Sequence, residues 1–453
     1  MTKTIIRLIL PAACVAVLAC VGCGGADPSG ADQLDQEKAV PQPLERDETF
    51  RIAFRTFEPF EAAIQREWAE FSEESGCRLQ LEAVAMDHQP LYEALFEEKG
   101  LKRGDWDVAF INTDWVAEAH RAKALLDLAP LIAKDPPEDY PDGWTPSLLR
   151  LQQVGKAVLG LPYHDGPECL IYRRDMLEDP MLREVYFANY GYPLAVPETW
   201  NEFVRVAEFL NRTEQKLYGT VFAAYPDGHN TVYDVCLQLW TRGGELFDRQ
   251  GKMQLSTPKM IEALEFYRAM LGNKVAVHPE CRKFDSVKTG EAFARGEVVM
   301  MINWFGFAAI CETSEDSKVK GKVAVAPIPH GPDGAAASLN VYWMLSVAAG
   351  SPHKKTAYRF VRRCMGRAAD RQRTLEGVIG CRKSTWTDEQ VNEAIPFYRK
   401  MEALHEHARE LPPVANWVDL AAVIDRMVLE TINTDRPIAS IVCEAQQEAD
   451  KLQ

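Results

Sequence analysis

The residues of this sequence that could do chemistry are aromatic and acidic side chains, and they form no catalytic arrangement. The motifs of α/β-hydrolases, zinc proteases, phosphate-binding loops, dinucleotide-binding turns and EF-hand loops do not occur in the chain. Aromatic residues instead stand beside polar or other aromatic ones, as in Asp114-Trp115 and Trp304-Phe305. Catalysis therefore has no positive support in the sequence, and we expect neither an enzyme nor a cofactor.

Two further groups of residues invite a metal or redox interpretation. His405-Glu406-His407 lies in a segment, Met401 to Glu410, that we expect to be helical. Residues two apart on a helix point away from each other, so we expect a solvated helix face and no metal site. Cys20-Val21-Gly22-Cys23 has the spacing of a redox pair but lies in an apolar N-terminal segment. The later cysteines lack paired ligand spacing, which argues against zinc and leaves one or two disulfides open.

The N-terminus has the layout of an export signal. Basic residues precede a mostly apolar stretch, Leu8 to Val21, that is too short to be a spanning helix. The small residues before a cysteine resemble a bacterial lipoprotein box, in which the signal is cut and the cysteine is lipidated. Cys23 is followed by Gly-Gly, and Cys20 has the better aliphatic residue three places upstream. We expect a signal peptide over 1–22 and lipidation at Cys23, with Cys20 as the alternative.

Composition and charge bound the remainder of the chain. Its 453 residues, 47% hydrophobic and 26% charged, exceed the size at which one core stops growing, so we expect two lobes. The formal charge of -15 argues against nucleic acid as a partner, because phosphate binding needs clustered Lys and Arg. Residues 23–47 are rich in Gly, Pro and polar residues, which is typical of a flexible tether.

The folded body alternates between strand and helix patterns. Phe50 to Phe54 alternate as in a strand, Phe60 to Phe71 recur at helical spacing, and Leu79 to Ala83 alternate again. A third strand is expected over Trp106 to Phe110. This order indicates an α/β sheet with its ligand at the carboxyl ends of the strands, here the loop 112–115.

Helix starts further along the chain carry clear signals. Thr199 and Glu202 form a capping box, whereas Thr257-Pro258 and Ser351-Pro352 each place a cap before a first-turn proline. We therefore expect helices to begin near Trp200, Pro258 and Pro352. Further strands are expected over 298–302, 323–326 and 341–347.

Six segments stand in a characteristic order. They are DWDVAFINTDWVAEAHRAKALLDLAPLI at 105–132, GLPYHDGPECLIYRRDMLEDP at 160–180, PETWNEFVRVAEFLN at 197–211, FARGEVVMMINWFG at 293–306, SPHKKTAYRFVR at 351–362 and GCRKS at 380–384. In this order they resemble the family 1 extracellular solute-binding proteins, the class that contains maltose-binding protein. One departure is Cys381, which stands where the family commonly has proline before the arginine of the last motif.

The resemblance implies a type II periplasmic-binding-protein fold of class α/β, with two discontinuous lobes joined by a hinge. Lobe one is expected over 48–160 and 318–376, and lobe two over 161–317 and 377–453. The resemblance also implies an extracytoplasmic monomer, held to the membrane by its lipid anchor. It would capture a sugar or oligosaccharide by hinge closure and deliver it to the permease subunits of an ABC importer.

Three other functions stay open at this point. The same fold could bind a polyamine, iron or an organic anion, because fold does not fix function. A lipid-anchored carbohydrate-active enzyme could use a carboxylate pair in the cleft. A sensor could present the ligand to a signalling receptor instead of a transporter.

Carried over position by position, the resemblance implies a pocket of aromatic and polar side chains. Rings would stack on the apolar faces of a sugar, and carboxylates would orient its hydroxyls. Ordinary structural roles compete with this: core packing for Trp115, a helix cap for Asp114 and a turn for Asp165. The expected ligand-binding residues are Asp114, Trp115, Tyr163, Asp165, Tyr225, Trp304, Phe305, Asn340, Tyr342, Trp343 and Trp417.

Overall fold

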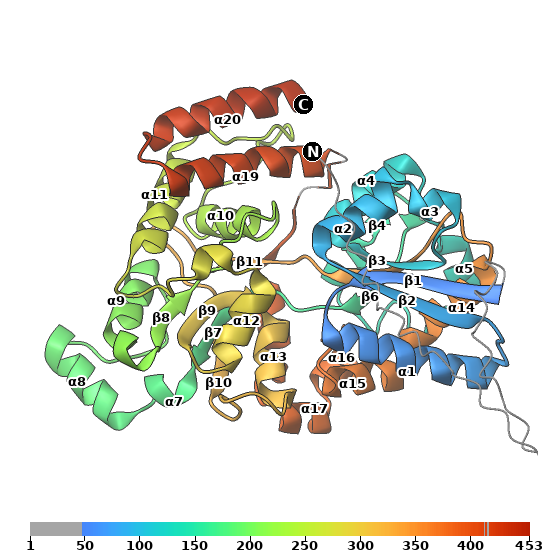
Figure 1. The fold of residues 1–453 in the computed structure, drawn as a ribbon, viewed down its shortest axis with the longest axis horizontal. Helices are drawn as coiled ribbons and strands as arrows, with labels where there is room; N and C mark the ends of the chain where they lie inside the picture. The colour runs from blue at the N-terminus through green and yellow to red at the C-terminus, as the bar shows by residue number, and fades with distance from the viewer. Residues whose placement is uncertain (1–47, 412, 415) are drawn as a thin grey trace, which may run out of the picture. The chain divides into compact units, whose positions relative to one another are not determined.

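The computed structural model of the chain describes residues 48–453 except 412 and 415. These residues belong to one compact unit, which contains two separate main sheets (Figure 1). The expected signal peptide, tether and lipidated cysteine lie outside the described residues. Within the described ranges, no helix has both the length and the apolar character needed to cross a membrane.

The first sheet has the strand order β2-β1-β3-β12-β6. Strand β1 pairs in parallel with both β2 and β3, whereas β12 is antiparallel to β3 and to β6. Helices α1 and α14 contact each other and pack on its strands. The bounds are β1 Thr49–Arg55, β2 Gln80–Met86, β3 Val108–Asn112, β6 Leu161–His164, β12 Trp343–Val347, α1 Glu58–Ser75 and α14 Lys354–Cys364. The strands expected near residues 50, 80, 108 and 345 are thus confirmed.

The second sheet has the strand order β10-β7-β9-β8. Strand β7 is antiparallel to β10 and to β9, and β8 is parallel to β9. Helices α9, α12 and α13 pack on this sheet. The bounds are β7 Glu168–Arg173, β8 Tyr218–Val221, β9 Val298–Trp304, β10 Val323–Ala326, α9 Trp200–Leu210, α12 Ser286–Ala294 and α13 Phe305–Thr313.

The remaining helices and short strands cover these sheets or connect them. Helix α10 packs on α11 and α19, and α19 packs on α20, beside the second sheet in Figure 1. The bounds are α2 His88–Tyr92, η2 Glu93–Glu97, α3 Gly100–Arg103, η3 Thr113–Trp115, α4 Val116–Ala122, α5 Ala129–Lys134, α6 Pro146–Leu151, β4 Gln153–Val154, β5 Ala157–Val158, α7 Arg174–Leu177, α8 Pro180–Tyr190, η4 Thr213–Gln215, α10 Asn230–Trp240, α11 Pro258–Gly272, η5 Cys281–Lys283, β11 Ser338–Leu339, α15 Arg367–Leu375, α16 Lys383–Trp386, α17 Glu389–Ala394, η6 Tyr398–Lys400, α18 Met401–Glu406, β13 Ala408–Arg409, α19 Trp417–Asn433 and α20 Ile438–Leu452.

The chain passes from the first sheet to the second between β6 and β7. In this connection Gly166 has a φ of 134°, and a Cβ there would lie 3.2 Å from Cβ of Phe305, so only glycine fits. The expected lobe boundaries place β6 in lobe two and β10 in lobe one. Strand pairing instead joins β6 to the first sheet through β12 and β10 to the second sheet through β7. The rest of the lobe division stays a prediction.

The helix-start signals were confirmed at two of the three places. Thr199 Oγ1 accepts from the backbone N–H of Glu202 at 3.3 Å, and the Glu202 carboxylate accepts from the N–H of Thr199 at 3.0 Å, so α9 begins with the expected capping box. Helix α11 begins at Pro258. The third prediction was wrong by two residues. Ser351 donates its hydroxyl to Asp107 and accepts from His353 N, so α14 begins only at Lys354.

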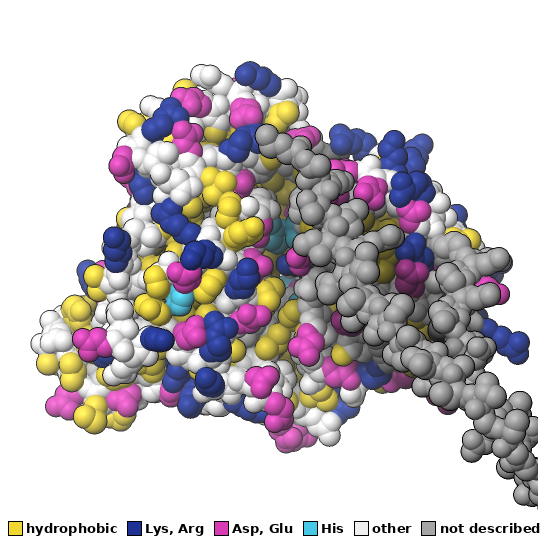
Figure 2. Space-filling model, in the orientation of Figure 1, with side chains coloured by type: hydrophobic (Ala, Val, Ile, Leu, Met, Phe, Trp, Pro, Cys, Tyr) yellow, Lys and Arg dark blue, Asp and Glu magenta, His cyan; other side chains and the backbone are white. Residues whose placement is uncertain are grey.

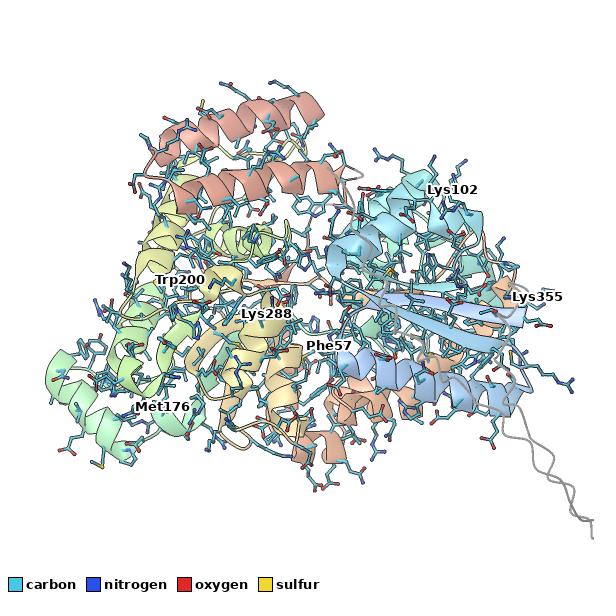
Figure 3. All side chains as sticks on the ribbon, viewed as in Figure 1. Phe57, Lys102, Met176, Trp200, Lys288 and Lys355 are labelled. Carbon is cyan, nitrogen blue, oxygen red and sulfur yellow. The ribbon has the colours of Figure 1, made fainter. Side chains whose placement is uncertain are left out.

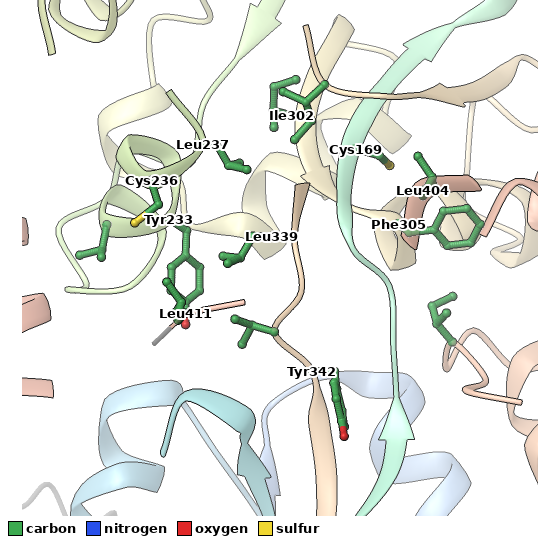
Figure 4. Close-up of a cluster of buried hydrophobic side chains, with 14 of the residues drawn as sticks. Cys169, Tyr233, Cys236, Leu237, Ile302, Phe305, Leu339, Tyr342, Leu404 and Leu411 are labelled. Carbon is green, nitrogen blue, oxygen red and sulfur yellow. The ribbon is translucent and has the colours of Figure 1, made fainter. Parts of the chain in front are cut away.

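The segment 401–410 also differs from the expected helix. Helix α18 ends at Glu406, and Ala408–Arg409 form strand β13, which pairs with β11. The sequence left one or two disulfides possible. The cysteines of the described residues are all free, however, and most of them are buried. Figure 4 shows two of them, Cys169 and Cys236, within the hydrophobic core.

Candidate functional site

A cavity of about 90 Å³, here called the first cavity, lies between the two sheets. Its wall on the first-sheet side comes from the ends of β1, β3, β6 and β12, and its opposite wall comes from β9 and the starts of α12 and α13. The carboxyl ends of β1, β3 and β6 therefore meet at one site, as expected for an α/β sheet. The lining residues include Arg55, Phe57, His88, Asn112, His164, Asp165, Asp227, His229, Trp304, Gly306, Phe307 and Trp343.

A second cavity of about 190 Å³ adjoins the first and shares His88, Asp227 and His229 with it. His88 begins α2 beside the first sheet, whereas His229 precedes α10. Their ring centroids are 4.1 Å apart, so this pair separates the two cavities. The second cavity is also lined by Tyr92, Asp114, Trp115, Tyr233 and Trp417.

Neither cavity reaches the roughly 300–1,000 Å³ that is typical of sites for small organic ligands. The two walls contact each other across the cleft, at His88 with His229 and at Tyr233 with Asp114, and a sugar-sized ligand would have to part them. We call this the closed arrangement. Because His88 and His229 come from opposite walls, their contact is among those that a ligand must replace. Figure 2 shows histidine side chains visible near the middle of the molecular face.

Trp304, Trp343 and Phe57 contribute aromatic surface to the first cavity, beside Phe60 and Phe307. Trp304 ends β9 and lies 5.8 Å from the Tyr233 ring, and Trp343 begins β12 and lies 5.7 Å from the Trp115 ring. Phe57 follows β1 and faces the helices of the second sheet in Figure 3. Rings held at strand ends are fixed by the ladder, which leaves their exposed faces available for stacking.

Asp165, in the connection between the sheets, is buried and lines the first cavity. Its Oδ2 lies 2.7 Å from Nε2 of His405, whereas Oδ1 has no hydrogen-bond partner among the described residues. The His405 ring stacks on Trp386, and its side chain is only 5% exposed. The expectation of a solvated helix face was therefore wrong for His405, because its ring is buried between Asp165 and Trp386.

Asp114 lines the second cavity and joins the two sides of the cleft. Its Oδ2 accepts from the Tyr233 hydroxyl at 2.7 Å, and Tyr233 lies on α10. Burial raises the pKa of Asp114 to about 6, against the lowering effect of hydrogen bonds from Tyr233 and Trp417. Trp115 and Trp417 are both buried and line the same cavity. Trp417 begins α19.

The structure places three of the expected site residues in the core. The Phe305 ring packs edge-on against Phe397 and Tyr398, and Figure 4 shows it beside Leu404. Tyr163 donates its hydroxyl to Glu67 at 3.1 Å, and Tyr342 donates to the carbonyl of Leu148 at 2.6 Å. Each neighbours a cleft residue in sequence but is itself buried in the core. For Tyr163 this follows from the alternation of side chains along β6.

Two further expected residues also lie away from the lining of both cavities. Asn340 is 2% exposed and its backbone N–H donates to the carbonyl of Arg409. Tyr225 is 46% exposed, with the Lys288 ammonium 5.8 Å from its ring centroid. The expected set is thus divided, and Asp165, Trp304 and Trp343 line the first cavity while Asp114, Trp115 and Trp417 line the second.

Sequence reasoning missed the basic and histidine side chains of the cleft. Arg55 and Phe57 directly follow the first expected strand, so the strand-end argument that selected Asp114 could also have selected them. His88 likewise follows the second strand. His164 and His229 had no local signal, because an isolated histidine belongs to no motif.

Burial controls the charge of these histidines. It lowers the pKa of His229 to about 3, with a further contribution from the Arg55 charge. Burial, His229 and Arg55 lower the pKa of His88, and burial lowers that of His164 to about 3. The closed cleft therefore holds neutral imidazoles, and their protonation would favour an open arrangement.

Comparison with known sequences gives consistent matches. The profile of the family described as bacterial extracellular solute-binding protein matches residues 57–363. A probable ABC transporter-binding protein of Deinococcus radiodurans is 26% identical over 325 residues, covering 70% of this chain and 73% of that protein. A putative binding protein of Brucella abortus is 24% identical over 326 residues, covering 70% and 72%.

Solved structures share the fold. The maltose-bound T. maritima protein MalE3 superposes with a TM-score of 0.77 at 23% identity, covering 89% of this chain and 100% of that one. A solute-binding protein of Agrobacterium radiobacter in complex with ribitol superposes with a TM-score of 0.78 at 23% identity, covering 89% and 98%. These matches confirm the expected α/β, two-lobed fold.

Proposed function

The chain belongs to the bacterial extracellular solute-binding proteins, and on that premise we propose that it captures a carbohydrate and delivers it to an ABC importer. The observation that carries the choice of ligand is the first cavity, where Trp304 and Trp343 lie with Asp165 and Asn112. Rings that stack and side chains that bind hydroxyls suit a sugar. The maltose and ribitol complexes of proteins with the same fold support this choice.

Capture would proceed by closure of the two halves around the ligand. The closed arrangement is held across the cleft by the Tyr233–Asp114 hydrogen bond and by the contact of His88 with His229. A ligand shifts the population only through its different affinity for the open and closed states. A sugar that replaces the His88–His229 contact and touches Trp343 on one wall and Trp304 on the other would bind fully only when the two halves close around it. The permease subunits would then recognise this ligand-bound closed form.

The extracellular family assignment places the chain outside the cytoplasm. We further propose that the mature protein is a monomer anchored through a lipid on Cys23, with Cys20 as the alternative. Labelling of cells with a radioactive fatty acid tests the anchor. Cys23→Ala should abolish labelling and Cys20→Ala should leave it, and the reverse result would assign the lipid to Cys20.

Thermal unfolding of the purified full chain with a ligand panel tests the choice of carbohydrate. The panel holds neutral and acidic sugars, polyols, polyamines, amino acids and ferric citrate. A specific ligand raises the unfolding midpoint by mass action, so at least one carbohydrate should raise it and be recovered unchanged. A shift from a polyamine or iron alone would overturn the carbohydrate proposal, and recovery of a cleaved sugar would overturn simple binding.

A further inference from the structure

The acidic side chains of the first cavity are largely satisfied by the protein itself. Asp227 accepts three hydrogen bonds, from the backbone N–H of His229 at 3.0 Å, from that of Asn230 at 3.0 Å and from the Asn230 amide at 2.7 Å. Asp165 uses Oδ2 for His405. Of these two carboxylates, only Oδ1 of Asp165 is left to accept from a ligand.

The basic side chains of the same cavity are less committed. Arg55 donates from Nη1 to Asp87 at 2.8 Å, but the Asp87 side chain is 75% exposed, so water screens that pair. Neither ring nitrogen of His88 has a hydrogen-bond partner among the described residues, although both atoms are buried. His229 faces His88 from the other wall. Arg55, His88 and His229 are here called the basic cluster. Arg55 has one screened carboxylate partner, and His88 has no hydrogen-bond partner among the described residues.

The other end of the cavity also presents donors. Helix α13 begins there without a side-chain cap, and its residues Gly306 and Phe307 line the cavity. By contrast, Asp285 accepts from Lys288 N and caps α12. His164 Nδ1 accepts from the N–H of Ile379, so the neutral ring carries its proton on Nε2, which lies 3.6 Å from the ideal Cβ position of Gly306. Uncapped helix starts favour electron-rich groups.

We propose that the carbohydrate is anionic, with a carboxylate or phosphate group that enters between His88 and His229 and is bound by the basic cluster. Its hydroxyls donate to Oδ1 of Asp165, and its ring lies against Trp304 or Trp343. The inference rests on the proposed function, because it specifies the class of sugar held in the same cleft. An anionic group supplies the acceptors and the negative charge that the cluster lacks.

The sign of the pH dependence separates an anionic ligand from a neutral one. In a closed cleft around a neutral sugar the histidines stay neutral, so acid below their ordinary pKa near 6.5 weakens binding. An anion in contact with both imidazoles favours their charged forms, so the same acidification strengthens binding. The other charged or titratable groups around the pair are Asp87, which accepts from Arg55, Tyr92 on α2, Asp114 on η3, His164 and Asp165 at the end of β6, Asp227 and Tyr233 at α10, and Asp425 and Arg426 on α19.

The experiment is a calorimetric titration of the full chain at pH 8 and pH 6. Matched probes are D-glucose with D-glucuronate and glucose 6-phosphate, and D-galactose with D-galacturonate. Acetate and inorganic phosphate control for the anionic group alone. An acidic member should bind at least about tenfold more tightly than its neutral partner and more tightly at pH 6 than at pH 8. The carboxylate and phosphate arms show which group the cluster prefers.

Variants locate the effect. Arg55→Gln should reduce the preference for the acidic over the neutral sugar at least about tenfold. The double variant His88→Gln, His229→Gln should remove the increase of this preference between pH 8 and pH 6. Arg249→Gln removes an exposed charge outside the cavities, so this variant should retain the preference for the acidic sugar and its increase at pH 6. The circular dichroism spectrum of each variant checks that it is folded.

The outcomes for the inference and for the proposed function are distinct. Neutral sugars that bind as tightly as acidic ones, or acidic sugars that bind more weakly at pH 6 than at pH 8, would overturn the inference and leave the proposed function intact. An acidic preference that survives Arg55→Gln in a folded variant would overturn the role of the cluster. Binding of no carbohydrate, while another solute binds, would overturn both.

Discussion

Two groups of buried polar side chains in this molecule differ in whether the protein completes their interactions. Beside the first sheet, the side chain of Arg373 is fully buried. It donates to Glu67 at 2.7 Å, to the carbonyl of Cys364 at 2.6 Å and to Asp370 at 3.0 Å. Asp370 also accepts from the N–H of Cys381 and the hydroxyl of Thr385. This group, the buried ion network, draws its charged partners from the fold, and only Nε of the Arg373 guanidinium has no partner among the described residues.

The cleft has the opposite character. Oδ1 of Asp165 and both ring nitrogens of His88 are buried without partners among the described residues. A buried polar atom without a partner costs free energy that a bound ligand can restore. The comparison suggests that the ion network contributes to stability, and it supports the proposal that the unpartnered atoms of the cleft bind a ligand.

Breaking the ion network should produce the largest effect. Arg373→Met leaves the buried carboxylates of Glu67 and Asp370 without their cation, so the free energy of unfolding should fall by about 3–5 kcal/mol. Urea unfolding of the ligand-free protein measures this. Adding Glu67→Gln to Arg373→Met removes one stranded charge and should restore part of the loss. A loss below about 1 kcal/mol in the single variant would contradict the assignment of the network to stability.

Asp114 should have the next effect, and it depends on pH. Because its pKa is raised to about 6 in the folded protein, its stabilising contribution is complete below its ordinary pKa near 3.9 and is lost as pH rises through 6. The shift corresponds to about 3 kcal/mol. The difference in unfolding free energy between wild type and Asp114→Asn should change by that order between pH 4 and pH 7.

Asp333→Asn is the matched control, because this carboxylate is 78% exposed. Its difference from wild type should stay flat over the same range. A flat difference for Asp114→Asn as well would show that the buried carboxylate of the cleft is satisfied like those of the ion network.

Removing a ring from the cleft should weaken binding and spare stability. Trp304→Ala loses the stacking surface on one wall, so the affinity for the carbohydrate found in the panel should fall at least tenfold, or about 1.4 kcal/mol. Fluorescence or calorimetric titration measures it. Phe187→Ala on α8 removes a ring that is 57% exposed and should bind as wild type does. Equal affinity in both variants would remove Trp304 from the site.

The smallest effect sharpens the comparison from the stability side. Thr199→Ala removes the cap of α9, which packs on β8 and β9, and should cost about 1 kcal/mol of unfolding free energy. Ligand affinity should stay that of wild type, since neither cavity includes α9. A loss of ligand affinity in Thr199→Ala would contradict the separation of stability from ligand binding, because it would show that a change far from the cavities weakens both.

Much of the fold could be predicted from the sequence because its signals are local. Alternation placed the strands near residues 50, 80, 108 and 300, and the capping box placed the start of α9. The start of α14 was missed because Ser351 is engaged by Asp107, which lies far away in the chain. The same long-range reason explains His405, whose partner Asp165 lies 240 residues away.

The site was predictable only in part. The end of the third strand pointed to Asp114, and the family resemblance pointed to Trp304 and Trp343. The residues next to these two tryptophans, Phe305 and Tyr342, face the core instead. The basic cluster joins segments near residues 55, 88 and 229, and no local pattern links them. Whether a buried polar group is satisfied depends on the completed packing, which the sequence alone does not display.

A crystal structure of the full chain with the carbohydrate that stabilises it tests the central claim most directly. The account predicts the sugar in the first cavity, in contact with Trp304 or Trp343 and with Oδ1 of Asp165, and with His88 and His229 moved apart. A sugar bound outside this cleft, with the His88–His229 contact intact, would contradict the claim that the incomplete polar groups mark the ligand site.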